Sequence, residues 1–129
     1  MTNNQKPNNK FDLEKRTTEF AKRVIRLCRA LSRDSINNRL SGQGVGSAGS
    51  MGANYREAND ALGKKDFLLR MRIARKEAKE TMHWLECIEE ANPEFKNRMQ
   101  ELKKECVEIK NIFSAIIIKV EKNNKKKKV

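Results

Sequence analysis

Small and apolar residues recur at alternating spacings of four and three along two long segments, and this rhythm restricts the chain to packed helices. Positions three and four apart share one face of an α-helix, so each segment presents a single stripe to a neighbouring helix. In the segment 65–90 the stripe is Phe67, Met71, Ala74, Ala78, Thr81, Leu85 and Ile88. In the segment that follows Pro93 it is Phe95, Met99, Leu102, Cys106, Ile109, Phe113, Ile116 and Val120. The two segments are therefore expected to be helices of one bundle.

A third segment, from Asp12 to about Arg33, carries the same rhythm and is also expected to be a helix. Asp12 is suited to cap its first turn. The stripe of this helix is Leu13, Thr17, Phe20, Val24, Leu27 and Leu31. The stretch from Asp34 to Asn38 is typical of a turn, because its aspartate, serine and asparagine side chains can each cap the helix that follows.

The segment 37–62 gives conflicting signals. Five of the six glycines of the chain lie in it, and at about 1 kcal/mol each they cost a helix about 5 kcal/mol relative to alanine. Propensity therefore predicts a loop from Ser41 to Ser50. A helical rhythm nevertheless runs through Leu40, Gly44, Ser47, Met51, Asn54, Ala58 and Leu62, and a loop this long is unusual in a compact domain. The residues predict a helix from Met51 to Leu62, ended by Gly63, and leave both structures open before it.

The last helix is predicted from three agreeing signals at 92–94: a capping asparagine, a proline at the first position and an acid in the first turn. Short connections make neighbouring helices antiparallel, so the expected fold is an all-α, antiparallel up-down-up-down four-helix bundle. We expect a disordered N-terminal segment at 1–10, the bundle at 11–121 and a basic C-terminal tail at 122–129. Ile112 and Ile117 widen the last stripe, which fits either an oligomer interface or a deeper core within one chain. The lysine-rich tail is either functional or a plain disordered end.

The chain is strongly basic, with a net charge of +12 and a sequence pI near 9.9. Such a charge indicates an anionic partner, nucleic acid first and an acidic protein surface second, although solubility alone also explains it. The candidate nucleic-acid-binding residues are Lys22, Arg26, Arg29, Arg33, Lys64, Lys65, Arg70 and Arg72. The four on the first helix repeat on one face and either contact phosphates or form a solvated surface. One Trp and one Tyr cannot build a base-stacking platform, so phosphate contacts and a steep salt dependence are expected.

No catalytic, cofactor-binding or metal site is predicted. His83 is the single histidine; we find no cysteine or carboxylate matched to it at ligand spacing and interpret it as packing beside Trp84. Residues 80–83 match the Glu-x-x-His motif of di-iron bundles, but the required second copy is absent. Glu77 and Glu80 are expected to form ion pairs with bases of the first or second helix. The glycine-rich run lacks the ending and the preceding strand of a phosphate loop.

The location expected from the sequence is the cytoplasm. The three cysteines lack CxxC spacing and are interpreted as reduced, small apolar residues. The first ten residues are polar, so no signal peptide is predicted. The longest apolar run is far too short to span a membrane.

Four motifs stand out in the middle of the chain. They are SMGANYREA at 50–58, DF at 66–67, IARKEAKET at 73–81 and WL at 84–85. In order and spacing they resemble the four-helix-bundle family of 23S rRNA intervening-sequence proteins, and the resemblance covers about Phe11 to Val120. It implies that the stretch from Ser41 to Leu62 is helical and that the protein is a homopentamer. It also relates the chain to the accessory protein of diversity-generating retroelements, a basic pentamer that binds nucleic acid and the reverse transcriptase.

The resemblance also assigns roles to polar residues of the motifs. It implies that four of them are structural or interface residues, bridging the second and third helices or adjacent subunits: Asn54, Glu57, Glu77 and Glu80. The chain departs from the family where bulky apolar and basic residues are usual, since it carries Gly44, Val45, Gly46 and Gly49 there. This departure removes one basic position that could contact nucleic acid.

The leading hypothesis from the sequence is therefore a non-enzymatic, oligomeric bundle that binds RNA or DNA through phosphates. The alternative is a protein-interaction scaffold or accessory subunit whose basic face docks an acidic partner such as a reverse transcriptase. No cofactor and no membrane contact is expected.

Overall fold

The computed structural model of the protein describes the backbone of residues 10–128 and the side chains of residues 12–123. Its elements are α1 (Lys10–Ala30), α2 (Ser35–Asn59), α3 (Lys64–Ala91), the 3-10 turn η1 (Pro93–Phe95) and α4 (Lys96–Lys128). Within the described residues there is no strand, so the prediction of an all-α, four-helix protein is confirmed. Of the predicted disordered segment 1–10, residues 1–9 lie outside the described part of the chain and Lys10 begins α1. Of the predicted tail 122–129, the backbone is helical to Lys128, and the side chains after Asn123 lie outside the described part.

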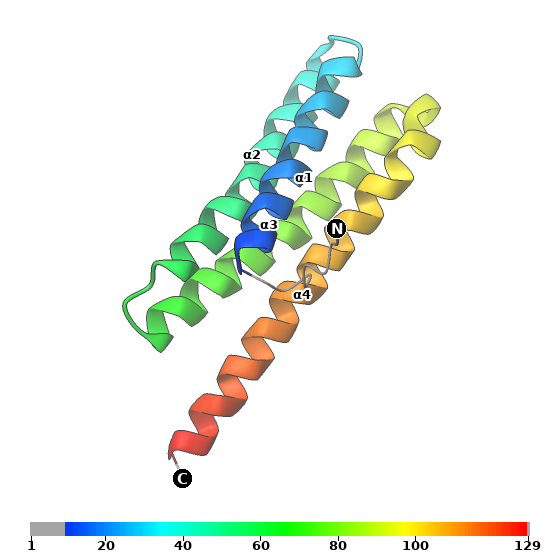
Figure 1. Cartoon of the computed structure of the whole chain (residues 1–129). Helices are drawn as coiled ribbons and strands as arrows, with labels where there is room; N and C mark the ends of the chain where they lie inside the picture. The colour runs from blue at the N-terminus through cyan, green and yellow to red at the C-terminus, as the bar shows by residue number, and fades with distance from the viewer. Residues whose placement is uncertain (1–9, 129) are drawn as a thin grey trace, which may run out of the picture.

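Successive helices lie side by side and connect at alternating ends of the molecule (Figure 1). The turn between α1 and α2 and the corner between α3 and α4 share one end, and the α2–α3 connection lies at the other. Two contacts fix the direction of α3 against α2: Thr81 donates to Ser47, and Arg70 donates to Asn54. Figure 1 also shows that α4 continues beyond the α2–α3 connection, so its last turns extend past the rest of the bundle.

The core combines the predicted stripes of the first, third and fourth helices with Ala48, Met51, Tyr55 and Ala58 of α2. Every member of the α1 stripe is at most 6% exposed, and the α3 stripe is buried from Met71 to Ile88. Tyr55 of α2 stacks on Phe113 of α4, with ring centroids 5.8 Å apart. Within the described residues no helix is both long and apolar enough to cross a membrane.

The glycine-rich stretch is helical throughout, so the propensity-based expectation of a loop at 41–50 is wrong. None of the glycines has a positive φ, which means that they serve through their small size. A Cβ on Gly52 would lie 2.9 Å from Thr17 Oγ1, and one on Gly44 would lie 3.4 Å from Ile88 Cδ1. At Gly52 α2 therefore approaches α1 too closely for a larger side chain, whereas a Cβ on Gly44 would make an ordinary van der Waals contact with α3. Tertiary packing therefore outweighs the intrinsic penalty of glycine.

The end of α2 also differs from the sequence prediction. The helix ends at Asn59 rather than Leu62, and Leu62 is fully exposed instead of belonging to the buried stripe. Gly63 is extended, with φ −165°, and it precedes α3 as its N-cap instead of ending α2. The first helix likewise ends at Ala30, before Asp34, whose carboxylate accepts from the Asn37 backbone N–H at 2.7 Å and caps α2.

Asn92 stands at the N-cap position before Pro93, as predicted, but its side chain makes no capping hydrogen bond. Its side chain is 3% exposed and forms a reciprocal amide pair with Asn37, at 2.8 and 3.1 Å. The two amides also donate to backbone oxygens, of Ile88 and Ser32 respectively. The pair ties the α1–α2 turn to the α3–α4 corner, so it locks one end of the bundle.

Candidate nucleic-acid interface

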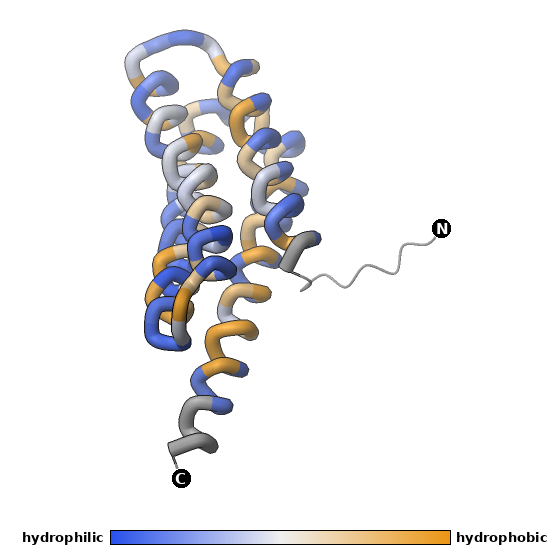
Figure 2. The backbone as a smooth tube through the Cα atoms, turned by 60° about the vertical axis from the view of Figure 1, so that its left-hand side comes forward, coloured by the Kyte–Doolittle hydropathy of each residue, from blue (hydrophilic) through white to orange (hydrophobic). Residues whose placement is uncertain are grey.

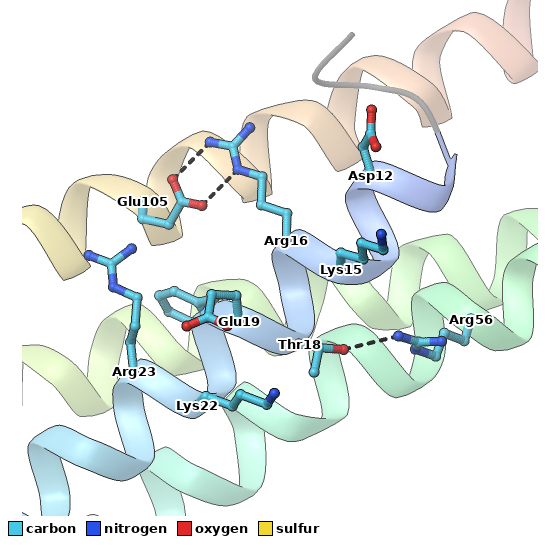
Figure 3. A pocket seen from close by; sticks show the side chains of 10 residues that line it. Asp12, Lys15, Arg16, Thr18, Glu19, Lys22, Arg23, Arg56 and Glu105 are labelled. Carbon is cyan, nitrogen blue, oxygen red and sulfur yellow. Dashed lines mark hydrogen bonds and ion pairs between the residues drawn. The ribbon is translucent and has the colours of Figure 1, made fainter. Parts of the chain in front are cut away.

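The outer face of α1 carries a groove of about 730 Å³ that reaches both neighbouring helices (Figure 3). Most of its lining comes from α1, with one residue from α2 and one from α4. The lining is Asp12, Lys15, Arg16, Thr18, Glu19, Phe20, Lys22, Arg23, Arg56 and Glu105. Five of these ten side chains are cationic. The four cations of α1 lie at this surface because the polar positions of the helix alternate with its buried stripe.

Two of the five cations are held by carboxylates. Arg16 donates to both oxygens of Glu105, at 2.7 and 2.8 Å, and to Glu108 at 2.9 Å. The hydrogen bond to Glu105 is the largest cause that raises the pKa of Arg16. Arg56 bridges α2 to α1 by donating to Glu14 at 3.1 Å and to Thr18 at 3.1 Å. These two arginines fasten α1 to its neighbours.

The other three cations of the groove are available to a ligand. No ion pair joins Lys15, Lys22 or Arg23 to another residue in the described part of the chain. Figure 3 shows Lys15 and Lys22 apart from the bonded pairs. The groove therefore combines fixed walls with unpaired positive charge.

Arg23 also lines a second, smaller groove of about 200 Å³ between α1 and α4. Its lining is Arg23, Arg26, Leu27, Arg98 and Leu102. It contains three guanidinium groups and no carboxylate. Arg98 lies over the Phe95 ring, 5.4 Å from the centroid. Arg26 pairs with Glu19 at 2.9 Å, but both side chains are more than half exposed, which weakens such a pair in water.

Arg29 lies in the last turn of α1, and Arg33 lies in the α1–α2 turn that follows. They line a third concavity, of about 490 Å³, beside the α1–α2 turn. All the predicted α1 cations are therefore exposed at the surface, although they face different hollows. We group these predicted cations with the other cations of the two α1 grooves that no carboxylate of another helix holds, and call the set the α1 basic surface. It consists of Lys15, Lys22, Arg23, Arg26, Arg29, Arg33 and Arg98.

The structure does not join the predicted α3 residues to this surface. α3 begins at the end of the bundle opposite the α1–α2 turn (Figure 1), and α1 does not pack against α3. Arg70 donates to Asn54 at 3.2 Å, and Arg72 pairs with Glu121 at 2.6 Å. Lys64 also makes an interaction, and Lys65 is exposed. The helix length therefore separates the two halves of the expected surface within one chain, and the role of the α3 residues in binding stays a prediction.

The motif residues divide into two groups. Asn54 joins α2 to α3, since its Oδ1 accepts from Arg70 while its amide donates to the Ser50 carbonyl at 2.9 Å. Glu57 and Glu80 are exposed and Glu77 is half-buried. Neither Glu77 nor Glu80 pairs with a base of α1 or α2 within the described residues, contrary to the sequence expectation. Burial and then repulsion from Glu80 raise the pKa of Glu77 above its ordinary value.

The described side chains form no three-ligand metal centre: no three His, Cys, Asp or Glu residues converge among them. Cys106 is a buried free thiol and Cys28 is a half-buried one, and burial raises the pKa of Cys106 to about 12. His83 packs edge-on against Trp84, with ring centroids 4.8 Å apart. The basic grooves are therefore the features best suited to binding a ligand.

Five cations around α1 were not predicted from the sequence, among them Arg16, which pairs with Glu105. Lys15 and Arg23 flank the chosen face and could have been found on a helical wheel. Arg56 and Arg98 come from other helices. Their approach to α1 depends on how the helices pack, which no local pattern encodes.

Comparison with known proteins places this architecture among related chains. The family profile of the 23S rRNA-intervening sequence proteins matches residues 9–115. The fold is similar to the crystal structure of a protein of unknown function from the S23 ribosomal protein family of Bacteroides thetaiotaomicron. The two are 30% identical, the TM-score is 0.73, and the match covers 84% of this chain and 96% of that one. No curated protein matches the sequence.

Proposed function

Since this chain belongs to the 23S rRNA-intervening sequence protein family, we propose that it is a non-enzymatic, oligomeric helical bundle of the cytoplasm that binds RNA or DNA. Binding is through phosphate groups on the α1 basic surface. The proposed role is binding and not catalysis.

The observation that carries this proposal is the groove between α1 and α4. Arg23, Arg26 and Arg98 line it, and no carboxylate shares it. Guanidinium groups on two helices can grip one phosphate by bidentate hydrogen bonds, which a single lysine cannot do. Arg23 connects this groove to the larger one, where Lys15 and Lys22 add unpaired charge. The result is a basic track along α1 that matches a repeating polyanion.

The track favours backbone contacts over base recognition. Tyr55 is 2% exposed and therefore not available for stacking, and Trp84 lies on α3 instead of α1. A protein that contacts phosphates alone binds by shape and charge, and its affinity falls steeply with salt. The protein is therefore expected to prefer structured nucleic acid to any particular sequence.

We propose further that the bundle is a homo-oligomer, a pentamer by family resemblance. Large apolar side chains remain exposed on the single chain, including Ile36 at 63%, Leu69 at 54% and Ile118 at 49%. Figure 2 shows that the second half of α4 is rich in hydrophobic residues, of which Ile117 is buried against the bundle and Ile118 is exposed. Light scattering should give five times the 14.9 kDa mass of one chain, whereas a monomeric mass would contradict this part of the proposal.

The experiment is a binding titration of labelled structured RNA and duplex DNA over a salt series. The test variant is Arg23→Ala/Arg98→Ala, which removes two guanidiniums from the α1–α4 groove. If both contact phosphates, the slope of log affinity against log salt falls by about 1.4 to 1.8. Arg26→Ala/Arg29→Ala tests whether the surface extends towards the α1–α2 turn.

The matched control is Lys65→Ala/Lys76→Ala, which removes the same charge from two exposed positions of α3. Binding by the α1 basic surface predicts a smaller slope for the arginine variants and an unchanged slope for the control. Equal losses in all variants would mean diffuse attraction and no defined surface. Absence of binding by the folded protein even at low salt would refute nucleic-acid binding and direct attention to an acidic protein partner, such as a reverse transcriptase.

A further inference from the structure

His83 and Cys87 lie one helical turn apart on α3, with imidazole Nε2 3.8 Å from the thiol sulfur. His83 is exposed and Cys87 is half-buried, so solvent reaches both. From the sequence alone, no cysteine was predicted at ligand spacing to His83. The structure corrects this, because a separation of four residues brings two helical side chains together on one face.

The separation of the two atoms matches that of two ligands on one metal ion. Zinc lies about 2.3 Å from a cysteine sulfur and about 2.0–2.1 Å from a histidine nitrogen. At a tetrahedral angle these bond lengths place sulfur and nitrogen about 3.6 Å apart. The observed 3.8 Å therefore needs to shorten by only about 0.2 Å for both atoms to ligate.

We propose that His83 and Cys87 form a two-ligand site for a soft divalent metal ion of the zinc class. The neutral imidazole supplies Nε2, and the Cys87 thiol supplies its sulfur after releasing one proton to solvent. Water completes the remaining positions of the ion. This site lies on a helix that does not pack against α1, so it is separate from the nucleic-acid binding proposed above.

The surroundings favour Cys87 over the other thiols. Cys106 is buried, and desolvation raises its pKa to about 12, which disfavours the thiolate that binds metal. Burial also raises the pKa of Cys28. Two exposed carboxylates, Glu80 and Glu90, lie one turn before His83 and one turn after Cys87, together with one exposed lysine, Lys79.

The test is a titration of the reduced, full-length protein with Co²⁺, followed by displacement with Zn²⁺. A cobalt–thiolate bond gives a charge-transfer absorption band, which reports sulfur ligation directly. Trp84 is the single Trp of the chain, and its ring centroid is 4.8 Å from that of His83. Paramagnetic Co²⁺ bound there should quench its fluorescence in parallel with the band.

The expected result is one Co²⁺ per chain, with band and quenching lost together when Zn²⁺ is added. His83→Asn and Cys87→Ser should each weaken Co²⁺ binding at least about tenfold. Even the loss of a residue that only supports a metal ligand lowers metal affinity by about that factor. Both positions face solvent, so the variants should stay folded by circular dichroism. Cys28→Ser is the control and should bind as the parent does.

Three outcomes would overturn the proposal. The first is the absence of a cobalt–thiolate band up to millimolar metal, which would leave only a weak S–H···N contact. The second is a band that survives in Cys87→Ser, and the third is a band that disappears in Cys28→Ser.

Discussion

The glycines of α2 offer a sharp test of how this helix packs. Gly42, Gly46 and Gly49 have open space where a Cβ would be, with nothing within 4 Å. At Gly52 the same Cβ would lie 2.9 Å from Thr17 Oγ1 and 3.2 Å from Thr17 Cβ. One substitution, Gly→Ala, therefore has opposite expected effects at two places in one helix.

At Gly46 the expected change is a gain. Alanine is better than glycine in a helix by about 1 kcal/mol, and no neighbour opposes the added methyl group. For a chain of this length that gain raises the melting temperature by about 3–5 °C. Gly46→Ala should therefore be more stable than the parent.

At Gly52 the same intrinsic gain is outweighed by a clash. Thr17 is fully buried and its hydroxyl donates to the Glu14 carbonyl at 3.0 Å, so the hydroxyl cannot turn away without losing that bond. Overpacking of this kind costs about 1–3 kcal/mol. Gly52→Ala should therefore lose about 1 kcal/mol net, since the propensity term offsets part of the cost.

The assay is urea unfolding followed by circular dichroism at one fixed protein concentration, because association would otherwise shift the midpoint. Thr17→Ala removes the nearest clashing atom, so Gly52→Ala should be less damaging in that background. A Gly52→Ala protein stabilised as much as Gly46→Ala would refute the close approach of α1 and α2. A destabilised Gly46→Ala would show that the outer face of α2 is covered in the assembled protein.

Three further predictions follow from other contacts. Asn37→Ala and Asn92→Ala should each lower the free energy of unfolding by about 2 kcal/mol, because each leaves a buried amide without its partner. In urea unfolding the double variant should lose less than the sum of the two single losses, whereas full additivity would mean that the two amides are not coupled. Folding raises the pKa of Glu77 above 4.5, so the ionised carboxylate destabilises the folded state increasingly as pH rises past 4.5. Glu77→Gln should therefore raise the melting temperature at pH 7 and change it little below pH 4. Equal shifts of the melting temperature at the two pH values would contradict this. Arg16→Ala should lower the free energy of unfolding by about 1–2 kcal/mol. Arg16→Lys should lose somewhat less, because lysine keeps the charge but cannot bind both oxygens of Glu105 as arginine does. An unchanged melting temperature in both variants would show that the Arg16–Glu105 pair does not hold α1 against α4.

The basic surface could be anticipated from sequence only in part. The charges of α1 follow from its helical period, so Lys22 and Arg26 were expected at the surface and lie there. The contribution of Arg98 required the packing of α4 against α1. The distance from α1 to the start of α3 likewise depends on which ends of the helices meet, and the pattern of charges along the chain does not contain that information.

The sequence by itself determined the helices whose buried stripes are unbroken. In α1, α3 and α4 the alternation of four and three buries one face whatever the partner, because the hydrophobic effect needs only that the apolar positions share a side. Only the tertiary structure decided that α2 is helical across Gly44 and Gly52. At these two glycines α2 is stabilised by packing against Thr17 of α1 and Ile88 of α3. These contacts come from neighbouring helices, so the local helix propensity of α2 does not contain them. The tertiary structure also turned Asn92 inward to Asn37, since a buried amide finds its best partner wherever the fold brings another amide within reach.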